Sequence, residues 1–204
     1  MPLDAKQWVG EDADPEAQGS WRQEVSNFLA TKMPLPNTAE SFPTYLARLA
    51  SFVAELGIHE EPPHANSGQH FPNTLINWAL DYTLARRGLS VSPDGTGWSW
   101  CMAMARSLVS FAYDQFNLTY LDDRLPMTAY CPDMLGYATA NGLVGSAHVG
   151  CLALVKGDGT VVHVVILVAD LGNGWWRTAE GNESDSDRFG KRHESTFYAV
   201  RLPC

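Results

Sequence analysis

Apolar residues recur three or four positions apart in the chain up to about residue 142, which is the spacing of one face of an α-helix. Val25, Phe28 and Leu29 show this spacing first, and Pro34 ends that helix because proline cannot sit in a helix interior. The pattern predicts five helices in all, over residues 15–32, 38–56, 73–87, 98–115 and 132–141.

The pattern changes after Gly142, where β-branched apolar runs replace the helical spacing. Two such runs, over residues 150–156 and 160–169, are separated by the turn sequence GDGT and predict a hairpin. Further strands are predicted over residues 175–179 and 197–202. Helices followed by antiparallel strands indicate an α+β fold. We expect an N-terminal extension with one helix over residues 1–37 and a main domain over residues 38–204.

Composition narrows the class of partner. The chain has 204 residues, 45% of them hydrophobic, and a net charge of -9. An acidic chain gains nothing from phosphate backbones, so nucleic acid is not an expected partner. No cationic, apolar leader opens the sequence and no apolar run is long enough to cross a bilayer, so we expect a protein made in soluble form in the cytoplasm, without an integral membrane segment.

The candidate chemistry lies with one of the four cysteines, which we expect to be free thiols. Cys101 follows GTGWSW and begins a predicted helix, where unpaired backbone N–H groups favour a thiolate and can bind an oxyanion. His163 lies in the strand VVHVVIL, and Glu180 and Asn182 lie one strand later. Taken alone, each residue is more often structural; together they predict a nucleophile, a base and an orienting group.

Several stretches between residues 52 and 182 resemble the CHAP family, a branch of the papain-like NlpC/P60 clan of peptidoglycan hydrolases. They are FVAELGIHEEP, GWSWCMAMARSLV, VGCLALVKG, HVVILVAD and TAEGNES. The spacing also suits that family, with 163 − 101 = 62 positions from cysteine to histidine and 180 − 163 = 17 from histidine to glutamate. Val165 and Cys151 depart from the family's usual glycine and acidic residue.

The resemblance implies a papain-like fold, with residues 38–204 as the catalytic domain, and cleavage of an amide bond in the peptide part of peptidoglycan. Cys101 would attack the carbonyl and His163 would exchange the proton. Glu180 or Asn182 would orient the imidazole. His148, in SAHVG, is a rival base because its local string resembles the family's motif more closely. No metal or cofactor is expected: the chain has no C-x-x-C pair, and the spacing of His59, His64 and His70 fits no ligand set.

Tryptophans near these motifs are candidates for a substrate groove, although packing is an equally good interpretation. They are Trp98, Trp100 and Trp176. We see no repeat or second domain for anchoring to a cell wall, and the acidic charge disfavours polyanionic walls. We therefore expect an antibacterial effector, delivered by a type VI-like secretion system into the target periplasm and needing a cognate immunity protein and a secretion-system component. The alternatives are a phage endolysin, a cysteine protease or deamidase acting on a host protein, and an inactive binding module.

Overall fold

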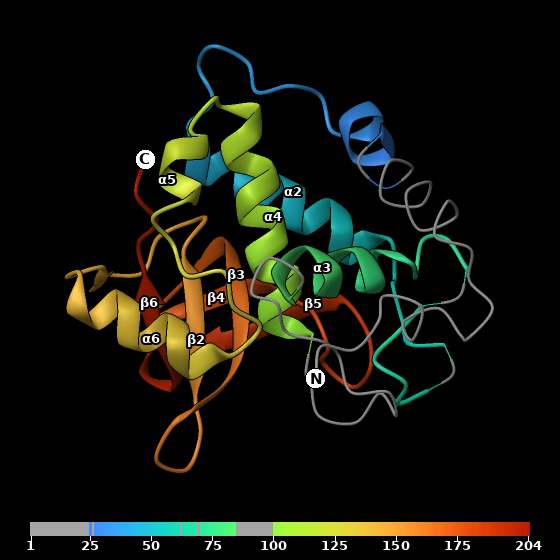
Figure 1. Cartoon of the computed structure of the whole chain (residues 1–204). Helices are drawn as coiled ribbons and strands as arrows, with labels where there is room; N and C mark the ends of the chain where they lie inside the picture. Colours follow the sequence, from blue (N-terminus) through green and yellow to red (C-terminus); the bar gives the residue numbers. More distant parts are fainter. Residues whose placement is uncertain (1–24, 26, 62, 69, 85–99) are drawn as a thin grey trace.

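The computed structural model describes residues 25, 27–61, 63–68, 70–84 and 100–204 (Figure 1). Residues 27–32 are helical, and the named helices that follow contain the apolar spacing seen in the sequence. They are α2 (Phe42–Glu55), α3 (Leu75–Leu84), α4 (Cys101–Gln115), the single turn α5 (Thr119–Asp122) and α6 (Cys131–Ala140). No helix within these described ranges is long and apolar enough to cross a membrane.

Six strands form one sheet in which all neighbours are antiparallel, in the order β1-β6-β2-β3-β4-β5. Their bounds are β1 (Val144–Gly145), β2 (Leu152–Lys156), β3 (Val161–Gly172), β4 (Trp175–Glu180), β5 (Arg188–His193) and β6 (Phe197–Val200). Asn173 and Gly174 join β3 to β4 with φ of 52° and 75°. These positive values suit the two-residue turn that asparagine and glycine favour. The predicted α+β order, helices first and antiparallel strands second, is confirmed.

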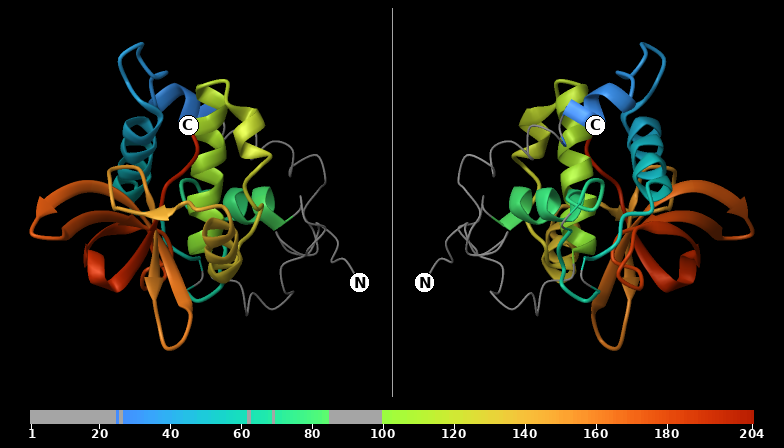
Figure 2. Two further views of the ribbon diagram at one scale, coloured as in Figure 1. Left: turned by 90° about the vertical axis from the view of Figure 1, so that its left-hand side faces the viewer. Right: turned by 90° about the vertical axis from the view of Figure 1, so that its right-hand side faces the viewer.

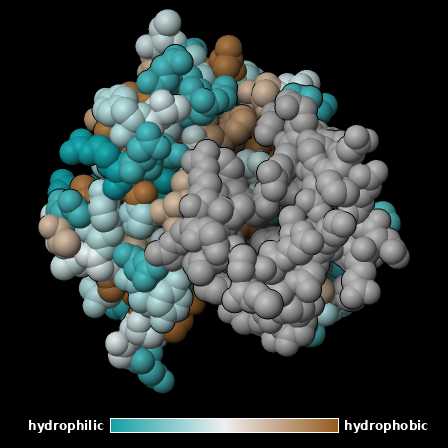
Figure 3. Space-filling view, in the orientation of Figure 1, coloured by the Kyte–Doolittle hydropathy of each residue, from teal (hydrophilic) through white to brown (hydrophobic). Residues whose placement is uncertain are grey.

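The helices gather on one side of the strands (Figures 1 and 2). Because side chains alternate along a strand, Val164 and Ile166 of β3 belong to the large core shared with the helices. Their neighbours Val165 and Leu167 belong to a smaller apolar cluster on the other side, with Trp176 of β4. On the face seen in Figure 3, hydrophobic residues are scattered among hydrophilic ones. The burial of apolar surface is thus concentrated between α2, α4 and the sheet.

Some predictions differ from the structure. No strand is predicted between residues 179 and 197, but Arg188–His193 form β5, the edge strand that pairs with β4. The helix predicted over residues 98–115 begins at Cys101. Most of the helix predicted over residues 15–32 lies outside the described residues. Leu29 and Met33, inside the predicted extension, are buried in the same core as α2, so this segment packs on the main domain.

A buried ion pair fixes α4 to the turn that follows it. Arg106 is 0% exposed, and its Nη1 donates to Asp122 Oδ1 at 2.6 Å and to Ser110 Oγ. Its Nη2 donates to the main-chain oxygen of Asp122 at 3.0 Å. Because Arg106 lies five positions after Cys101 on the same helix, this network helps to hold α4, whose first residue is Cys101.

We expect Asp122→Ala to lower the free energy of unfolding by about 3–5 kcal/mol, because it leaves the buried Arg106 charge unpaired. Urea unfolding followed by circular dichroism measures this loss. Asp123→Ala is the matched control, since Asp123 is exposed and its removal is expected to change stability by less than about 0.5 kcal/mol. Equal effects of the two substitutions would show that the pair contributes no stability.

Candidate functional site

Cys101 is the first residue of α4 and is 2% exposed. The helix begins here through the bond from Met104 N to Trp100 O, at 2.8 Å. Trp100 occupies the N-cap position without a side-chain bond to the first turn, and its Nε1 instead donates to Glu60 Oε1 at 2.7 Å. This buried bond fixes the start of the helix. The thiol therefore sits in the positive field of a helix N-terminus that the N-cap side chain does not satisfy.

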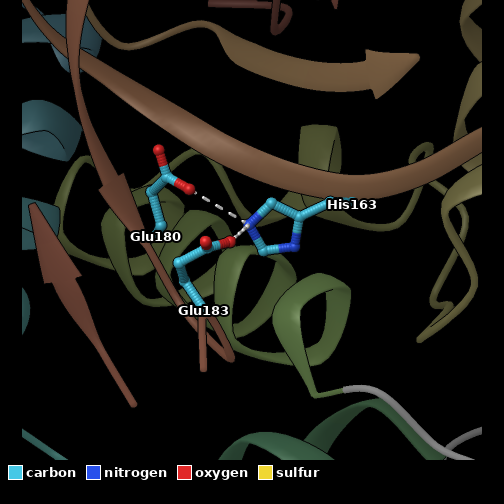
Figure 4. A group of neighbouring side chains, drawn as sticks. All are labelled: His163, Glu180 and Glu183. Atoms are coloured by element: carbon cyan, nitrogen blue, oxygen red, sulfur yellow. Dashed lines mark ion pairs between the residues drawn. The ribbon is translucent and has the colours of Figure 1, made fainter. Parts of the chain in front are cut away.

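His163 lies on β3, opposite Val155 of β2, with a side chain that is 12% exposed. Figure 4 shows two carboxylates reaching the same ring nitrogen. Nε2 is 3.4 Å from Glu180 Oε2 and 3.9 Å from Glu183 Oε2. These distances make ion pairs rather than well-aligned hydrogen bonds, and no described group completes a hydrogen bond to Nε2. Since Nε2 faces the carboxylates, Nδ1 is the nitrogen left for the thiol of Cys101.

The electrostatic environment keeps His163 charged. Burial by itself would lower the pKa of the imidazole, but the interactions with Cys101 and Glu180 outweigh it and raise the pKa to about 9. At neutral pH the ring is therefore an imidazolium. The structure thus brings Cys101, His163 and Glu180 together from α4, β3 and β4, and their catalytic roles stay predictions.

Glu180 ends β4 and is bound from two further directions. Thr178, two residues earlier on the same face of the strand, donates from Oγ1 to Glu180 Oε1 at 2.5 Å. Arg192 on β5 donates from Nε to Oε1 at 3.0 Å and from Nη2 to Oε2 at 2.5 Å. Burial opposes ionisation of this carboxyl, but the bonds with His163, Arg192 and Thr178 lower its pKa to about 2. Glu180 is therefore a fixed carboxylate beside the imidazole.

The residues that follow β4 complete the surroundings of this carboxylate. Gly190 of β5 leaves room for it, because a Cβ at that position would collide with Glu180 Oε1. Asn182, the alternative orienting residue, is half-buried in the turn after β4 with a φ of 61°. It follows Glu180 by two residues, and which of the two orients the ring stays open.

The same side chains could in principle hold a metal ion. His163, Glu180 and Glu183 each offer one ligand atom, and these atoms all lie within 4.8 Å of one another. Arg192, however, donates to both carboxylates, and its Nη2 is 3.3 Å from Glu183 Oε2. A guanidinium in contact with two of the three ligands already neutralises them and would repel a cation. The donor set therefore fits a chain of ion pairs better than a metal centre.

The rival histidine has a thiol of its own. His148 Nδ1 lies 2.8 Å from the Sγ of Cys151, which precedes β2. Burial raises the pKa of Cys151 to about 11, so at neutral pH this sulfur is an un-ionised thiol. The structure thus contains two cysteine–histidine pairs, and only the pair of Cys101 and His163 also meets a carboxylate among the described residues.

Two of the three candidate tryptophans are buried, and the third is not described. Trp98 lies outside the described residues. Trp100 is 0% exposed and bonded to Glu60, and Trp176 is 7% exposed within the smaller apolar cluster. Burial leaves almost no exposed surface on the rings of Trp100 and Trp176, which favours packing as their role. Contact of the three tryptophans with substrate stays a prediction.

Sequence reasoning missed four residues that surround the predicted set: Arg192, Thr178, Asp187 and Cys131. Arg192 and Asp187 fall where no strand is predicted. The sequence RFGKRH has a single apolar residue and no alternation, so it carries no signal for the edge strand found there. Cys131 precedes Pro132 at a helix start, a position like that of Cys101, but a helix start does not reveal what faces it.

Asp187 is a buried acid close to Cys101. It is 5% exposed, and its Oδ2 has no hydrogen-bond partner within the described parts of the chain. It borders a cavity of about 10 Å³ that Cys101 and Gly181 also line, which is room for one water molecule. Burial raises the pKa of Asp187 to about 8, against the opposing charge of His163. Below that pH the side chain is a neutral carboxylic acid.

No protein-family model matches this chain, and searches of the curated proteins and of the solved structures find no match either. The functional argument therefore depends on the geometry and on the motifs themselves.

We expect the protein to lose stability as the pH rises from about 4 to about 8. Over this range the unfolded state releases the proton of Asp187, whose ordinary pKa is 3.8, while the folded state keeps it. The loss is at most about 1.4 kcal/mol per pH unit. Asp187→Asn removes the titration, so this variant should unfold at higher urea than wild type at pH 8–9, with the difference shrinking towards pH 4. Asp158→Asn, at an exposed turn position, should leave the pH dependence unchanged; a parallel pH dependence in wild type and Asp187→Asn would contradict a buried neutral acid.

Proposed function

We propose that this chain is a cysteine hydrolase that cleaves an amide bond in the peptide part of peptidoglycan, with the papain-like fold of the CHAP and NlpC/P60 enzymes. The observation that carries the reaction type is the meeting of Cys101 at a helix N-terminus with a charged His163 that is paired with Glu180. The substrate class comes from the resemblance of the W-C and E-G-N motifs to that family.

The mechanism starts from an ion pair. Because His163 is protonated at neutral pH, Cys101 and His163 act as thiolate and imidazolium, and the thiolate attacks the carbonyl carbon directly. Backbone N–H groups at the start of α4 stabilise the oxyanion that forms. The imidazolium then protonates the leaving amine, and the acyl–enzyme is hydrolysed by water that the neutral imidazole deprotonates.

The remaining charges support this cycle. Glu180 holds the ring through Nε2 and stabilises its charged form, as the carboxylate of a triad does. Arg192 and Thr178 in turn hold Glu180, so its orientation does not depend on the histidine alone. Asn182 is the alternative orienting residue in the same motif. Separate substitutions of Glu180 and Asn182 test which of the two orients the ring.

We propose delivery as an antibacterial effector, with a type VI-like route, action in the target periplasm and a cognate immunity protein as partner. This step is supported by the acidic net charge of -9 and the family resemblance, and phage endolysin is the alternative with the same chemistry. Two further alternatives are a protease or deamidase acting on a host protein and an inactive binding module. The effects of Cys101→Ala on muropeptide release and on toxicity distinguish these two from the effector and the endolysin.

The test is digestion of purified sacculi, with chromatography and mass spectrometry of the released muropeptides. We expect release by the wild type, a loss of about 10⁴-fold or more in Cys101→Ala and His163→Ala, and most of the activity retained in His148→Ala. The masses of the products identify the bond that is cut. Circular dichroism verifies that each variant is folded.

Muropeptide release by Cys101→Ala would overturn the assignment of the nucleophile. A folded but inactive His148→Ala, together with an active His163→Ala, would overturn the assignment of the base. Absence of release from sacculi, together with toxicity that depends on Cys101, would indicate a different substrate. Toxicity unchanged by Cys101→Ala would indicate a binding module.

We expect the activity to fall at alkaline pH with a midpoint near 9, because that is where His163 loses its proton. Glu180→Gln removes a negative charge 3.4 Å from the ring. This lowers the pKa of His163 and moves the alkaline limb of kcat/KM to lower pH, besides reducing its maximum. Glu183→Gln is the matched control: its carboxylate is 3.9 Å away and more exposed, so its shift should be smaller. An alkaline limb unmoved in Glu180→Gln would contradict the electrostatic role of Glu180.

A further inference from the structure

A second sulfur lies beside the nucleophile. Cys131 is the first residue of α6, and its Sγ is 4.0 Å from the Sγ of Cys101. Both residues are buried, at 5% and 2% exposure, and neither is in a disulfide. The N-termini of α4 and α6 therefore converge on a pair of thiols, and the hydrolytic mechanism uses only the thiol of Cys101.

The surroundings of Cys131 differ from those of the other two cysteines. A hydrogen bond with Cys101 and, after it, burial raise the pKa of Cys131 well above its ordinary value. Its S–H is therefore held as a donor to the sulfur of Cys101. Cys151 is paired with His148 in the segment between β1 and β2, and Cys204 is the exposed last residue. Cys131 is thus the cysteine placed to react with Cys101.

We propose that Cys101 and Cys131 form a dithiol modification site, which a hydroperoxide oxidises to a disulfide that reversibly blocks the sulfur of Cys101. A disulfide bond is about 2.05 Å long, so the two sulfurs must approach by roughly 2 Å from their separation of 4.0 Å. This inference goes beyond the proposed function, because the bond can form whether or not the chain hydrolyses peptidoglycan.

The reaction has two steps with balanced atoms and electrons. The thiolate of Cys101 attacks the hydroperoxide ROOH and breaks its O–O bond, giving the sulfenic acid of Cys101 and ROH once the alkoxide has taken a proton. The Cys131 sulfur then attacks the sulfenic sulfur, forming the S–S bond and releasing water. Overall, two thiols and ROOH give one disulfide, ROH and H₂O. Conversion of Cys101 to the sulfenic acid also removes the negative charge that raised the pKa of Cys131, so the second step becomes easier.

Attack by Cys131 competes with further oxidation. A sulfenic acid that meets no thiol proceeds to the sulfinic acid, which thiol reductants do not reverse. A neighbour at 4.0 Å traps the first product within the protein. Cys131 therefore protects Cys101 as well as blocking it, and a thiol reductant restores both.

The experiment uses the full chain, hydrogen peroxide as the probe and mass mapping of a non-reduced digest. We expect one cross-linked peptide that joins Cys101 to Cys131 and is lighter by two hydrogens than the sum of the two thiol peptides. It should disappear on treatment with dithiothreitol. In Cys131→Ser the same exposure should leave at least about 10-fold more Cys101 as sulfinic or sulfonic acid after reduction than in wild type. Cys151→Ser is the matched control and should behave as wild type.

Three results would overturn the proposal: Cys101 oxidised without a link to Cys131, a link to Cys151 or Cys204 instead, or equal irreversible oxidation in wild type and Cys131→Ser. Cys131→Ala is the second variant if Cys131→Ser does not fold, as judged by circular dichroism. Because the readout is a mass and not an activity, failure here is distinguishable from failure of the proposed function. A chain that forms the disulfide but releases no muropeptides would retain this inference and lose the other.

Discussion

The carboxylate of Glu180 is the charge around which the rest of the site is organised. A buried carboxylate is stable only when its oxygens are bonded and its charge is compensated. Glu180 meets both conditions through Arg192 on one side, Thr178 beside it and His163 on the other. The result is an alternating series of charges that runs from Arg192 through Glu180 and His163 to Cys101. Each member stabilises the ionised form of the next.

This series accounts for why the site needs the sheet as well as the helix. Arg192 lies on the edge strand β5 and Glu180 ends β4, so the two can meet only across the β4–β5 pair. His163 comes from β3 on the other side of β4, and Cys101 comes from α4. The contact between Arg192 and Glu180 also needs a glycine at position 190, because any side chain there would occupy the space of the Glu180 carboxylate. The charge on the imidazole thus depends on three adjacent strands being in register.

The sequence was enough for part of this picture. Periodicity predicted the α+β order because amphipathic helices and β-branched strands carry their signal locally. Cys101, His163 and Glu180 could be named because a helix start, an apolar strand and a following acid are each visible in the chain. Which partners surround them depends on pairing between strands, and a local pattern does not contain that register. For this reason no strand was predicted over Arg188–His193, and neither the burial of Asp187 nor the bond from Arg192 to Glu180 could be foreseen.

Burial also bears on the interpretation of aromatic residues. Trp100 is adjacent to Cys101 in sequence, which suggested a groove, but its ring is buried in the core and its Nε1 donates to Glu60. Adjacent residues at a helix start diverge by about 100°, so being next to a nucleophile does not place a side chain in the same cavity. Cys131 is the opposite case: it is thirty positions from Cys101 in the chain and 4.0 Å from it in space.

The two cysteine–histidine pairs show that a short distance alone does not make a reactive thiol. The Sγ of Cys151 lies only 2.8 Å from the Nδ1 of His148, which is a short distance for a hydrogen bond to sulfur. Burial nevertheless raises the pKa of the Cys151 thiol to about 11. It precedes a strand and lacks a helix N-terminus, and no described carboxylate forms an ion pair with His148. Burial disfavours a thiolate at Cys151 more than the charge of Arg201 favours it, so the proton stays on sulfur. At Cys101 the helix field and the imidazolium both favour the thiolate, and Glu180 favours the imidazolium. In the proposed mechanism, the carboxylate of Glu180 therefore also determines which of the two thiols acts as the nucleophile.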